Sequence, residues 1–372
     1  MSKPPSSASR PWGSASSGSS PFGVYLHVPF CASRCDYCAF ATWTDRHHLT
    51  TRYLDACRRE IVRAVDGGMP AATSVFVGGG TPSLVPASEL VAVLAAVPLA
   101  PGAEVTIECN PDTVTEDLVG TYFAGGVTRL SFGVQSMVPS TLRALGRTHD
   151  PENVSRSVAL ARAAGFETFN LDVIYGAAGE TLDDWRTTLE AIVELDPPHV
   201  SAYGLTVEPG TPLAADESRH PDEDLQADDY LLAEELLGGA GLRWYEISNW
   251  SKPGHECRHN LLYWQQGDYI GFGCAAHSHR QGRRWWNVRT PERYLDLIEA
   301  GESAEGGFEE LDDDQRAEER LQLALRMRGG VPAAALPLDE VEGLVSVDDD
   351  RAVLTPEGRL LANAVSLKLR AR

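Results

Sequence analysis

The sequence of 372 residues predicts an α/β fold in which six parallel strands and their helices form an open, TIM-like partial (β/α)6 barrel. From Gly23 onward, short β-branched or aromatic runs alternate with longer helical patterns, as in successive βαβ units. A cysteine-rich loop, a triple glycine and several polar residues fall at or just past the ends of these runs. That edge is the active face of a β/α barrel, so we expect these residues to lie close together.

The predicted strands begin with a buried run directly before the first cysteine. We expect strands at Val24–Val28, Ser74–Val77, Glu104–Glu108, Arg129–Val134, Thr168–Ile174 and His199–Thr206. Helical patterns lie between them at about residues 49–65, 87–97, 115–124, 139–146, 151–164 and 181–194, several of them preceded by Ser, Thr or Asp caps. Together these elements assign residues 23–245 to the barrel.

Three further segments flank this barrel. Residues 1–22 are rich in Ser, Pro, Ala and Gly and lack the apolar core of a secretory signal, so we predict a disordered tail. Residues 246–308 are dense in Trp, Tyr, His and Asn. Residues 309–372 show a helical stretch, a turn-rich ribbon and a closing helical stretch, which predicts a small C-terminal α+β domain.

The composition narrows the class of protein. A net charge of −21 disfavours binding to nucleic acid or to an anionic membrane, because both require a basic surface. No apolar run approaches the ~18 residues that a membrane span needs. The 7 cysteines show no regular disulfide spacing, which predicts a cytoplasmic protein with reduced thiols, and Cys57 and Cys109 are expected to be small buried residues.

Three cysteines form a C-x3-C-x2-C pattern at Cys31, Cys35 and Cys38. Three thiolates on one loop can hold three irons of a [4Fe-4S] cubane and leave the fourth iron without a protein ligand. Structural zinc and buried free thiols are the alternatives. Zinc sites usually add a second, closely spaced ligand pair, and none follows this loop. The spacing therefore predicts an iron–sulfur cluster with one open iron.

With Tyr37 before the third cysteine and the surrounding motif YLHVPFC, the loop resembles the radical S-adenosylmethionine (SAM) superfamily, in particular the oxygen-independent coproporphyrinogen III oxidase-like family. The resemblance implies that SAM binds the open iron through its amino and carboxylate groups. It also implies that an electron donor reduces the cluster, which then cleaves SAM to a 5′-deoxyadenosyl radical. The same family has a partial barrel and a small winged-helix-like C-terminal domain.

The family motifs also mark residues for binding SAM. Glycines in Gly78–Pro82 allow the backbone to approach a ligand closely, although a plain strand-to-helix turn would also explain them. Glu108 offers a carboxylate at a strand end, where an isolated Glu is otherwise a surface residue. By resemblance, SAM contacts are expected from Tyr25, Gly79, Gly80, Thr81, Glu108, Gln135, Arg147, Asp172 and Thr206.

A second motif, HNLLYW at residues 259–264, points to haem. An imidazole can bind haem iron and aromatic rings can cover a porphyrin, although an aromatic-rich hexamer with one histidine is more often part of a core. The motif resembles the haem-binding motif of the haem chaperones in this family, and GDYIGFGCAAHSH downstream supports the match. The expected haem-binding residues are His259, Asn260, Tyr263 and Trp264, with His277, His279 and Cys257 as further candidates.

These features favour one function and leave an alternative. The predicted function is a haem chaperone that binds haem, carries the cluster and exchangeable SAM, and passes haem to a respiratory haem protein. The alternative is an enzyme, an oxygen-independent coproporphyrinogen III dehydrogenase that oxidatively decarboxylates its substrate. Such enzymes carry a further cysteine where this sequence has Phe40, and they have a longer ordered N-terminal segment. Porphyrin ring opening or methyl transfer is a third, lower-ranked possibility.

Overall fold

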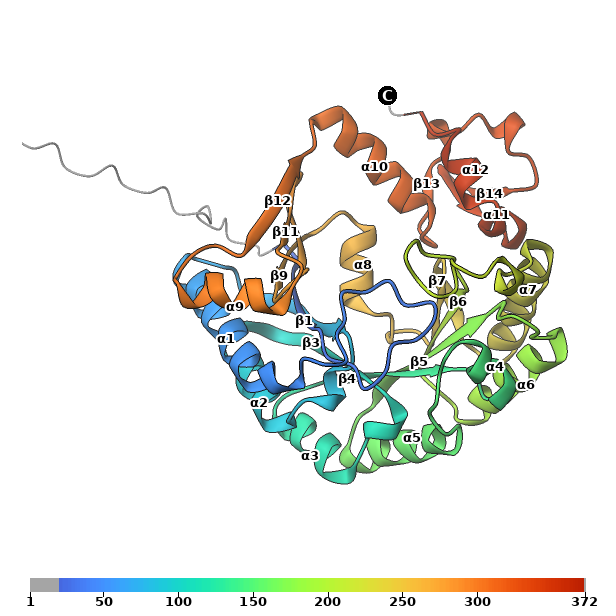
Figure 1. Ribbon diagram of the computed structural model, residues 1–372. Coiled ribbons are helices and arrows are strands. Elements are labelled where there is room, and N and C mark those ends of the chain that lie inside the picture. Colours follow the sequence, from blue (N-terminus) through green and yellow to red (C-terminus); the bar gives the residue numbers. More distant parts are fainter. Residues whose placement is uncertain (1–19, 371–372) are drawn as a thin grey trace, which may run out of the picture.

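Six parallel strands in sequential order form the centre of the structure, a computed structural model that describes residues 20–370 (Figure 1). The strands are β1 (Phe22–Val28), β2 (Ala72–Gly79), β3 (Leu99–Cys109), β4 (Arg129–Gln135), β5 (Thr168–Tyr175) and β6 (His199–Gly204). The helices between them are α1 (Thr50–Asp66), α2 (Ala87–Leu94), α3 (Glu116–Ala124), α4 (Pro139–Ala144), α5 (Glu152–Ala164) and α6 (Leu182–Glu194). The predicted (β/α)6 barrel is confirmed.

Several strand boundaries differ from the prediction, and two of them change the assignment of a predicted segment or site residue. β1 begins at Phe22, the last residue of the predicted tail, and residues 1–19 of that tail lie outside the described residues. The sixth strand ends at Gly204 because β6 pairs with its neighbours only up to that residue, so Thr206 lies in the following loop.

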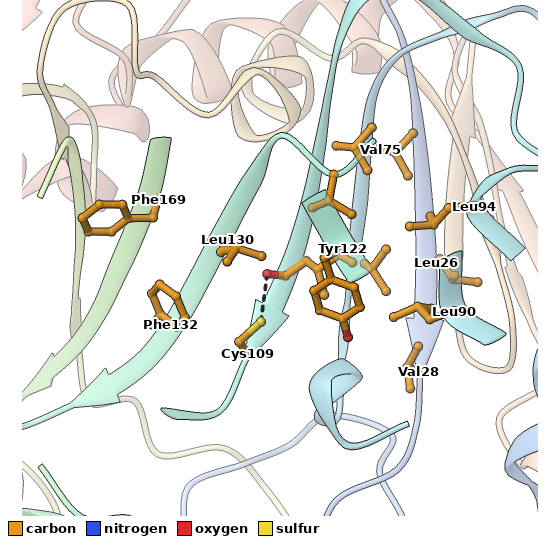
Figure 2. Packing of buried hydrophobic residues seen from close by; sticks show 14 of the residues in the cluster. Leu26, Val28, Val75, Leu90, Leu94, Cys109, Tyr122, Leu130, Phe132 and Phe169 are labelled. Atoms are coloured by element: carbon orange, nitrogen blue, oxygen red, sulfur yellow. Dashed lines mark hydrogen bonds between the residues drawn. The ribbon is translucent and has the colours of Figure 1, made fainter. Parts of the chain in front are cut away.

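The apolar core lies between the strands and the surrounding helices. Figure 2 shows Leu26 and Val28 of β1 facing Leu90 and Leu94 of α2, and all four side chains are buried. Cys57 and Cys109 are also buried, as predicted.

The opposite face of the strands, which lines the interior of the barrel, is polar. Buried side chains there include Ser74, Thr106, Ser131, Asn170 and Ser201. Because branched apolar residues usually fill the interior of a β/α barrel, this interior differs from a purely structural one.

The barrel does not close on itself. Its β1 edge continues into β9 (Asp268–Phe272), β10 (His277–Arg280), β11 (Arg283–Asn287) and β12 (Glu305–Glu310), and its β6 edge continues into β8 (Asn249–Ser251) and β7 (Arg243–Glu246). The result is a 12-stranded sheet. The polar and aromatic region at 246–308 therefore supplies strands to the barrel sheet and the helix α8 (Arg258–Trp264), which contacts β1 and β2.

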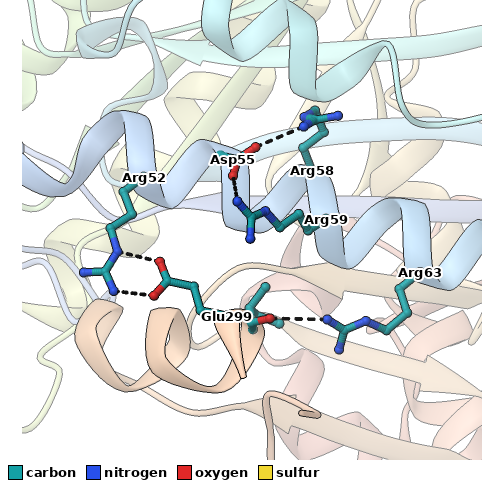
Figure 3. Close-up of polar contacts among 7 residues, drawn as sticks. Arg52, Asp55, Arg58, Arg59, Arg63 and Glu299 are labelled. Atoms are coloured by element: carbon teal, nitrogen blue, oxygen red, sulfur yellow. Dashed lines mark hydrogen bonds and ion pairs between the residues drawn. The ribbon is translucent and has the colours of Figure 1, made fainter. Parts of the chain in front are cut away.

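Helix α9 (Pro291–Glu299) fastens this extension to α1. Arg52 of α1 donates two hydrogen bonds to Glu299, at 2.5 and 2.6 Å (Figure 3). Arg63 of α1 donates to the backbone carbonyls of Ile298 and Glu302, at 3.4 and 2.8 Å. The extension is thus held from the outside of the barrel as well as through its pairing with β1.

The C-terminal residues form a small α+β unit with its own core. It contains α10 (Asp313–Leu325), β13 (Val331–Pro332), β14 (Val345–Asp348), β15 (Arg351–Leu354), α11 (Pro356–Leu360) and α12 (Ala362–Ser366). Arg359 of α11 donates two hydrogen bonds, at 2.9 and 2.8 Å, to Glu234 of α7 (Glu223–Gly239) and lies 4.4 Å over the ring of Trp244. No helix within residues 20–370 is long and apolar enough to cross a membrane.

Candidate functional site

A cavity of about 760 Å³ opens at the C-terminal ends of the strands. That volume lies within the usual range of small-molecule sites. Its walls include Cys31, Cys35 and Cys38 together with Gly79, Gly80, Thr81, Glu108, Gln135, Arg147, Asp172 and Thr206. The structure therefore brings the three thiols and all of the residues expected to contact SAM, except Tyr25, to one cavity.

The cysteine loop is held in place by groups other than the thiols. The backbone N–H of Cys31 donates to the Trp43 carbonyl at 3.1 Å, and the N–H of Asp36 donates to the Leu145 carbonyl at 3.3 Å. The Asp36 side chain also forms an ion pair with Arg219 at 2.7 Å. These contacts tie the loop to itself, to the end of α4 and to the segment after β6, so the direction of each thiol is set by the surrounding fold.

The thiols are free and suited to a cluster. Thr81 Oγ1 donates to Cys31 Sγ at 3.6 Å, and Arg147 Nη1 donates to Cys35 Sγ at 3.5 Å. Burial raises the pKa of the Cys31 and Cys38 thiols, so their thiolate forms require nearby positive charge, which iron would supply. Within residues 20–370, no group of three His, Cys, Asp or Glu side chains is arranged to bind one metal ion. A cubane does not require such a group, because each thiolate binds a different iron.

The glycine turn after β2 packs directly against the cysteine loop. The N–H of Gly80 donates to the Val28 carbonyl at 2.7 Å, and the N–H of Thr81 donates to the Phe30 carbonyl at 2.8 Å. A Cβ on Gly80 would lie 2.6 Å from the Phe30 carbonyl oxygen, which is too close for any side chain. Glycine is therefore required at position 80, because the two backbones approach each other closely there. This approach places Thr81, the next residue, in contact with the Cys31 thiol.

Two carboxyl groups lie on the wall of the cavity below this turn. Glu108 accepts a hydrogen bond from the Gly79 N–H at 3.3 Å, and burial, together with the nearby Asp172, raises the pKa of Glu108 to about 8. Burial also raises the pKa of Asp172, although Ser131 and Asn170 donate to its carboxylate at 2.8 and 2.7 Å. This wall can accept hydrogen bonds from amino or hydroxyl groups and can hold a proton at neutral pH.

Gln135 reaches the cavity through an irregular backbone. Its φ is 63°, in the left-handed region, and the register between β4 and β5 shifts between Gly133 and Gln135. A bulge of this kind redirects a side chain and is common beside active sites. Arg147 Nη2 donates to the Gly133 carbonyl at 2.9 Å, which fixes the arginine beside the bulge.

Tyr25 lies apart from the cavity wall. Its hydroxyl lies 3.2 Å from His27 Nδ1, and its ring stacks on Phe76 with a centroid separation of 6.5 Å. His27 in turn contacts the Ala41 carbonyl of the cysteine loop at 2.9 Å. Tyr25 thus reaches the loop only through His27.

Some wall residues were missed by the sequence-based prediction. Ser131 and Tyr203 line the cavity, and Tyr203 also lines a smaller cavity beside α8. Strand alternation could have found Ser131, because it lies two residues before Gly133 and four before Gln135 on the same strand face.

The haem motif is placed in and beside the barrel interior. His259 is 1% exposed, with Nδ1 2.9 Å from Ser74 Oγ and Nε2 2.8 Å from the Tyr263 hydroxyl. Burial lowers the pKa of His259 to about 3. Both ring nitrogens are therefore engaged, and this imidazole is neutral. Asn260, Tyr263 and Trp264 line the smaller cavity, of about 270 Å³, together with Tyr203, Glu246 and Leu323 of α10.

Comparison with known proteins agrees with these features. The Radical SAM superfamily model matches residues 25–192. The protein named Heme chaperone HemW from Mycobacterium tuberculosis (strain H37Rv) is 43% identical over 365 residues, covering 93% of this chain and 94% of that protein. Heme chaperone HemW from Bacillus subtilis (strain 168) is 32% identical, covering 92% and 97%, and that from Escherichia coli (strain K12) is 39% identical, covering 69% and 70%.

The solved structure of coproporphyrinogen III oxidase (HemN) from Escherichia coli, a radical SAM enzyme, superposes with a TM-score of 0.82. It covers 93% of this chain and 89% of that protein, at 23% sequence identity. This similarity shows a shared fold, whereas the sequence identities to the Mycobacterium tuberculosis and Bacillus subtilis proteins extend over 93% and 92% of this chain. The chain therefore belongs to the HemW family of radical SAM proteins.

Proposed function

We propose that this chain is a haem chaperone, which binds haem and transfers it to a haem-accepting respiratory protein. The observation that carries the proposal is the 43% identity, over 93% of the chain, to a protein named Heme chaperone HemW. The two cavities add support. The haem motif lines the smaller cavity, the three cysteines line the larger one, and Tyr203 lines both, so haem and the cluster would have separate but adjacent sites. The protein would act in the cytoplasm, because a cluster requires thiols that stay reduced.

In this proposal, Cys31, Cys35 and Cys38 hold a [4Fe-4S] cluster at the mouth of the larger cavity. When bound, the cluster supplies an iron without a protein ligand, which the amino and carboxylate groups of SAM can coordinate. Thr81 and Arg147 stabilise the thiolates at Cys31 and Cys35 through the hydrogen bonds that they donate. A separate protein would supply the electron that reduces the cluster.

The remaining wall residues would bind and orient SAM. Glu108 and Asp172 offer acceptors for its amino and hydroxyl groups, and Gly79, Gly80, Gln135 and Thr206 surround the same space. Tyr25 would act through His27, which contacts the cysteine loop. The haem would be contacted by α8, with Asn260, Tyr263 and Trp264 on the cavity side and His259 anchoring the helix in the barrel.

Anaerobic reconstitution tests this proposal. We expect iron and sulfide at about four of each per chain, and haem binding at about one per chain, recorded as an absorption spectrum with and without added haem. Mixing the haem-loaded protein with a haem-free acceptor should move the haem spectrum to the acceptor. Incubation with coproporphyrinogen III, a reductant and SAM is the opposing test, because formation of protoporphyrinogen would assign the chain to the dehydrogenase function instead.

A further inference from the structure

The histidines in and beside the haem motif differ in whether their nitrogens are available. Haem iron binds a free nitrogen of a neutral imidazole, so a nitrogen already held in a hydrogen bond must first lose its partner. His259 is engaged at both nitrogens by Ser74 and Tyr263. His279 is also engaged at both, with Nδ1 2.9 Å from the Gly267 carbonyl and Nε2 accepting from the Gly282 N–H at 3.2 Å. Neither ring can bind iron as placed.

His277, the first residue of β10, is different. Its side chain is exposed, and no other residue between 20 and 370 forms a hydrogen bond with its ring. The ring stacks on Trp286 of β11, with a centroid separation of 5.8 Å and an angle of 30°. Trp286 in turn lies over Gly307 of β12, where a Cβ would come within 2.7 Å of the indole. The imidazole is thus held by a ring while its nitrogens stay accessible.

His277 also lies on the face of the sheet that carries the haem and SAM residues. A Cβ on Gly271 of β9 would meet the His277 carbonyl oxygen at 2.3 Å, so the chain at His277 crosses over this glycine. Gly271 pairs with Tyr25 of β1. The backbone of His277 therefore lies against β9, the strand that pairs with β1, and its side chain shares a strand face with His279, whose ring contacts Tyr269.

Aromatic rings connect the haem motif to this part of the sheet. The rings of His259 and Tyr263 are 4.7 Å apart, those of Tyr263 and Tyr269 are 4.5 Å apart, and those of Tyr269 and His279 are 6.2 Å apart. His277 is two residues from His279 on the same strand. A planar, largely apolar ligand lying along this strip would meet Tyr263 and the motif on one side and the free imidazole of His277 on the other.

The backbone at His277 is firmly held. Glu60 of α1 accepts hydrogen bonds from the Gly273 N–H and from Asn287 Nδ2, each at 3.1 Å. The Asn287 N–H donates to the Ala276 carbonyl at 2.9 Å, directly before His277. The ion pair between Arg52 and Glu299 secures the same region (Figure 3). A ligand at this position would need little rearrangement of the protein, which favours affinity.

We propose that His277 is the protein ligand to the haem iron, that Trp286 positions its imidazole, and that His259 instead anchors helix α8 in the barrel. This proposal rests on the haem-binding function proposed above. It assigns the iron to the one histidine of this strip whose ring nitrogens are accessible, and it leaves the aromatic residues of the motif to contact the porphyrin.

The test is a titration of the full-length, cluster-reconstituted protein with ferric haem, comparing wild type, His277→Ala, His259→Ala and His48→Ala. His48 is an exposed histidine before α1 and serves as the matched control. We expect His277→Ala to weaken haem binding at least about tenfold and to shift the haem absorption maximum. Added imidazole should restore the wild-type spectrum. His48→Ala should behave as wild type, and His259→Ala should lose folding stability while its residual folded fraction keeps the wild-type haem spectrum.

Three results separate the failure of this inference from failure of the proposed function. Wild-type protein that binds no haem would overturn both. Wild-type binding with an unchanged spectrum and affinity in His277→Ala would overturn only the assignment of His277. A wild-type spectrum in His277→Ala that is lost in folded His259→Ala would return the iron ligand to His259.

Discussion

Ser74 and His259, 185 residues apart in the sequence, are joined by a hydrogen bond of 2.9 Å inside the barrel. Ser74 belongs to β2 and His259 to α8, so the bond fixes the helix of the haem motif to the barrel strands. The ring of His259 also stacks on Phe76 of β2 at 5.6 Å. The histidine of the haem motif therefore has a structural partner on the strand that leads to the glycine turn.

Removing this partner should destabilise the protein. Ser74→Ala leaves the buried Nδ1 of His259 without a hydrogen bond, and we expect a loss of about 1–3 kcal/mol in the free energy of unfolding. Urea denaturation measures this change in the free energy of unfolding. Ser155→Ala, on the exposed face of α5, is the control and should change the free energy by less than about 0.5 kcal/mol. Equal stability of Ser74→Ala and wild type would show that the bond contributes nothing.

Each cluster cysteine should be required for iron. Alanine at Cys31, Cys35 or Cys38 removes one of the three predicted cluster ligands, and anaerobically reconstituted variants should lose most of their iron and sulfide by chemical assay. Cys57→Ala is the control, because Cys57 is buried between α1 and α9, away from the cavity, and contacts the Tyr294 hydroxyl at 3.6 Å. Full iron content in any of the three loop variants would remove that residue from the ligand set.

Glycine at position 80 should be needed for the cluster even though it is not a ligand. A Cβ there would meet the Phe30 carbonyl at 2.6 Å and the Val28 carbonyl at 2.8 Å, so Gly80→Ala must push the cysteine loop away. We expect reduced iron content and lower stability. Gly120→Ala, in α3 with no atom within 4 Å of the added Cβ, is the matched control and should gain about 0.5–1 kcal/mol.

Stability should depend on pH through Glu108. Its folded-state pKa is about 8, against an ordinary value of 4.5, so between these values the folded chain keeps a proton that the unfolded chain releases. The free energy of unfolding should therefore decrease as pH rises from about 4.5 to about 8. Glu108→Gln should flatten this decrease, as measured by urea denaturation across the range in protein without cluster or SAM. An identical slope in the variant would assign the dependence to other groups.

The C-terminal unit should depend on Arg359. Its guanidinium is buried, donates twice to Glu234 and stacks on Trp244. Arg359→Met removes the ion-pair partner of Glu234 and leaves only the hydrogen bond from Trp250 Nε1, at 2.7 Å. We expect about 2 kcal/mol of destabilisation, below the range for fully buried pairs because Glu234 is 32% exposed. Arg359→Lys should not restore stability, because lysine cannot form the paired hydrogen bonds. Thermal unfolding and trypsin digestion of the C-terminal unit measure the effect, and full rescue by lysine would contradict this explanation.

The sequence predicted the barrel well because its signals are local. Alternating strand and helix patterns depend on neighbouring residues, so the six strands were found to within a few residues, apart from β3, which begins at Leu99 instead of Glu104. The cavity walls were also predictable, since the C-terminal ends of parallel strands meet at one edge. The predicted contacts to SAM, iron and haem themselves stay predictions.

Other features depend on contacts between distant segments and could not be read from the sequence. The parallel pairing of β9 with β1 joins residues about 246 apart, and no local pattern specifies it. Of the two partners of His259, Tyr263 lies four residues later in the same helix, but Ser74 belongs to β2, so the motif alone could not reveal that both ring nitrogens are engaged. The contact of Tyr25 with Phe76 of β2 likewise joins distant segments that no local pattern connects.

The hydrogen bonds that hold the cysteine loop bear on whether a lost cluster can be replaced. Trp43, Leu145 and Arg219 hold this loop, and none of the three is a proposed cluster ligand, so we expect removal of the proposed cluster to leave the shape of the loop unchanged. The loop would then accept iron and sulfide again without refolding. A protein molecule that has lost its cluster would then be reactivated by cluster reassembly, with no need for new synthesis.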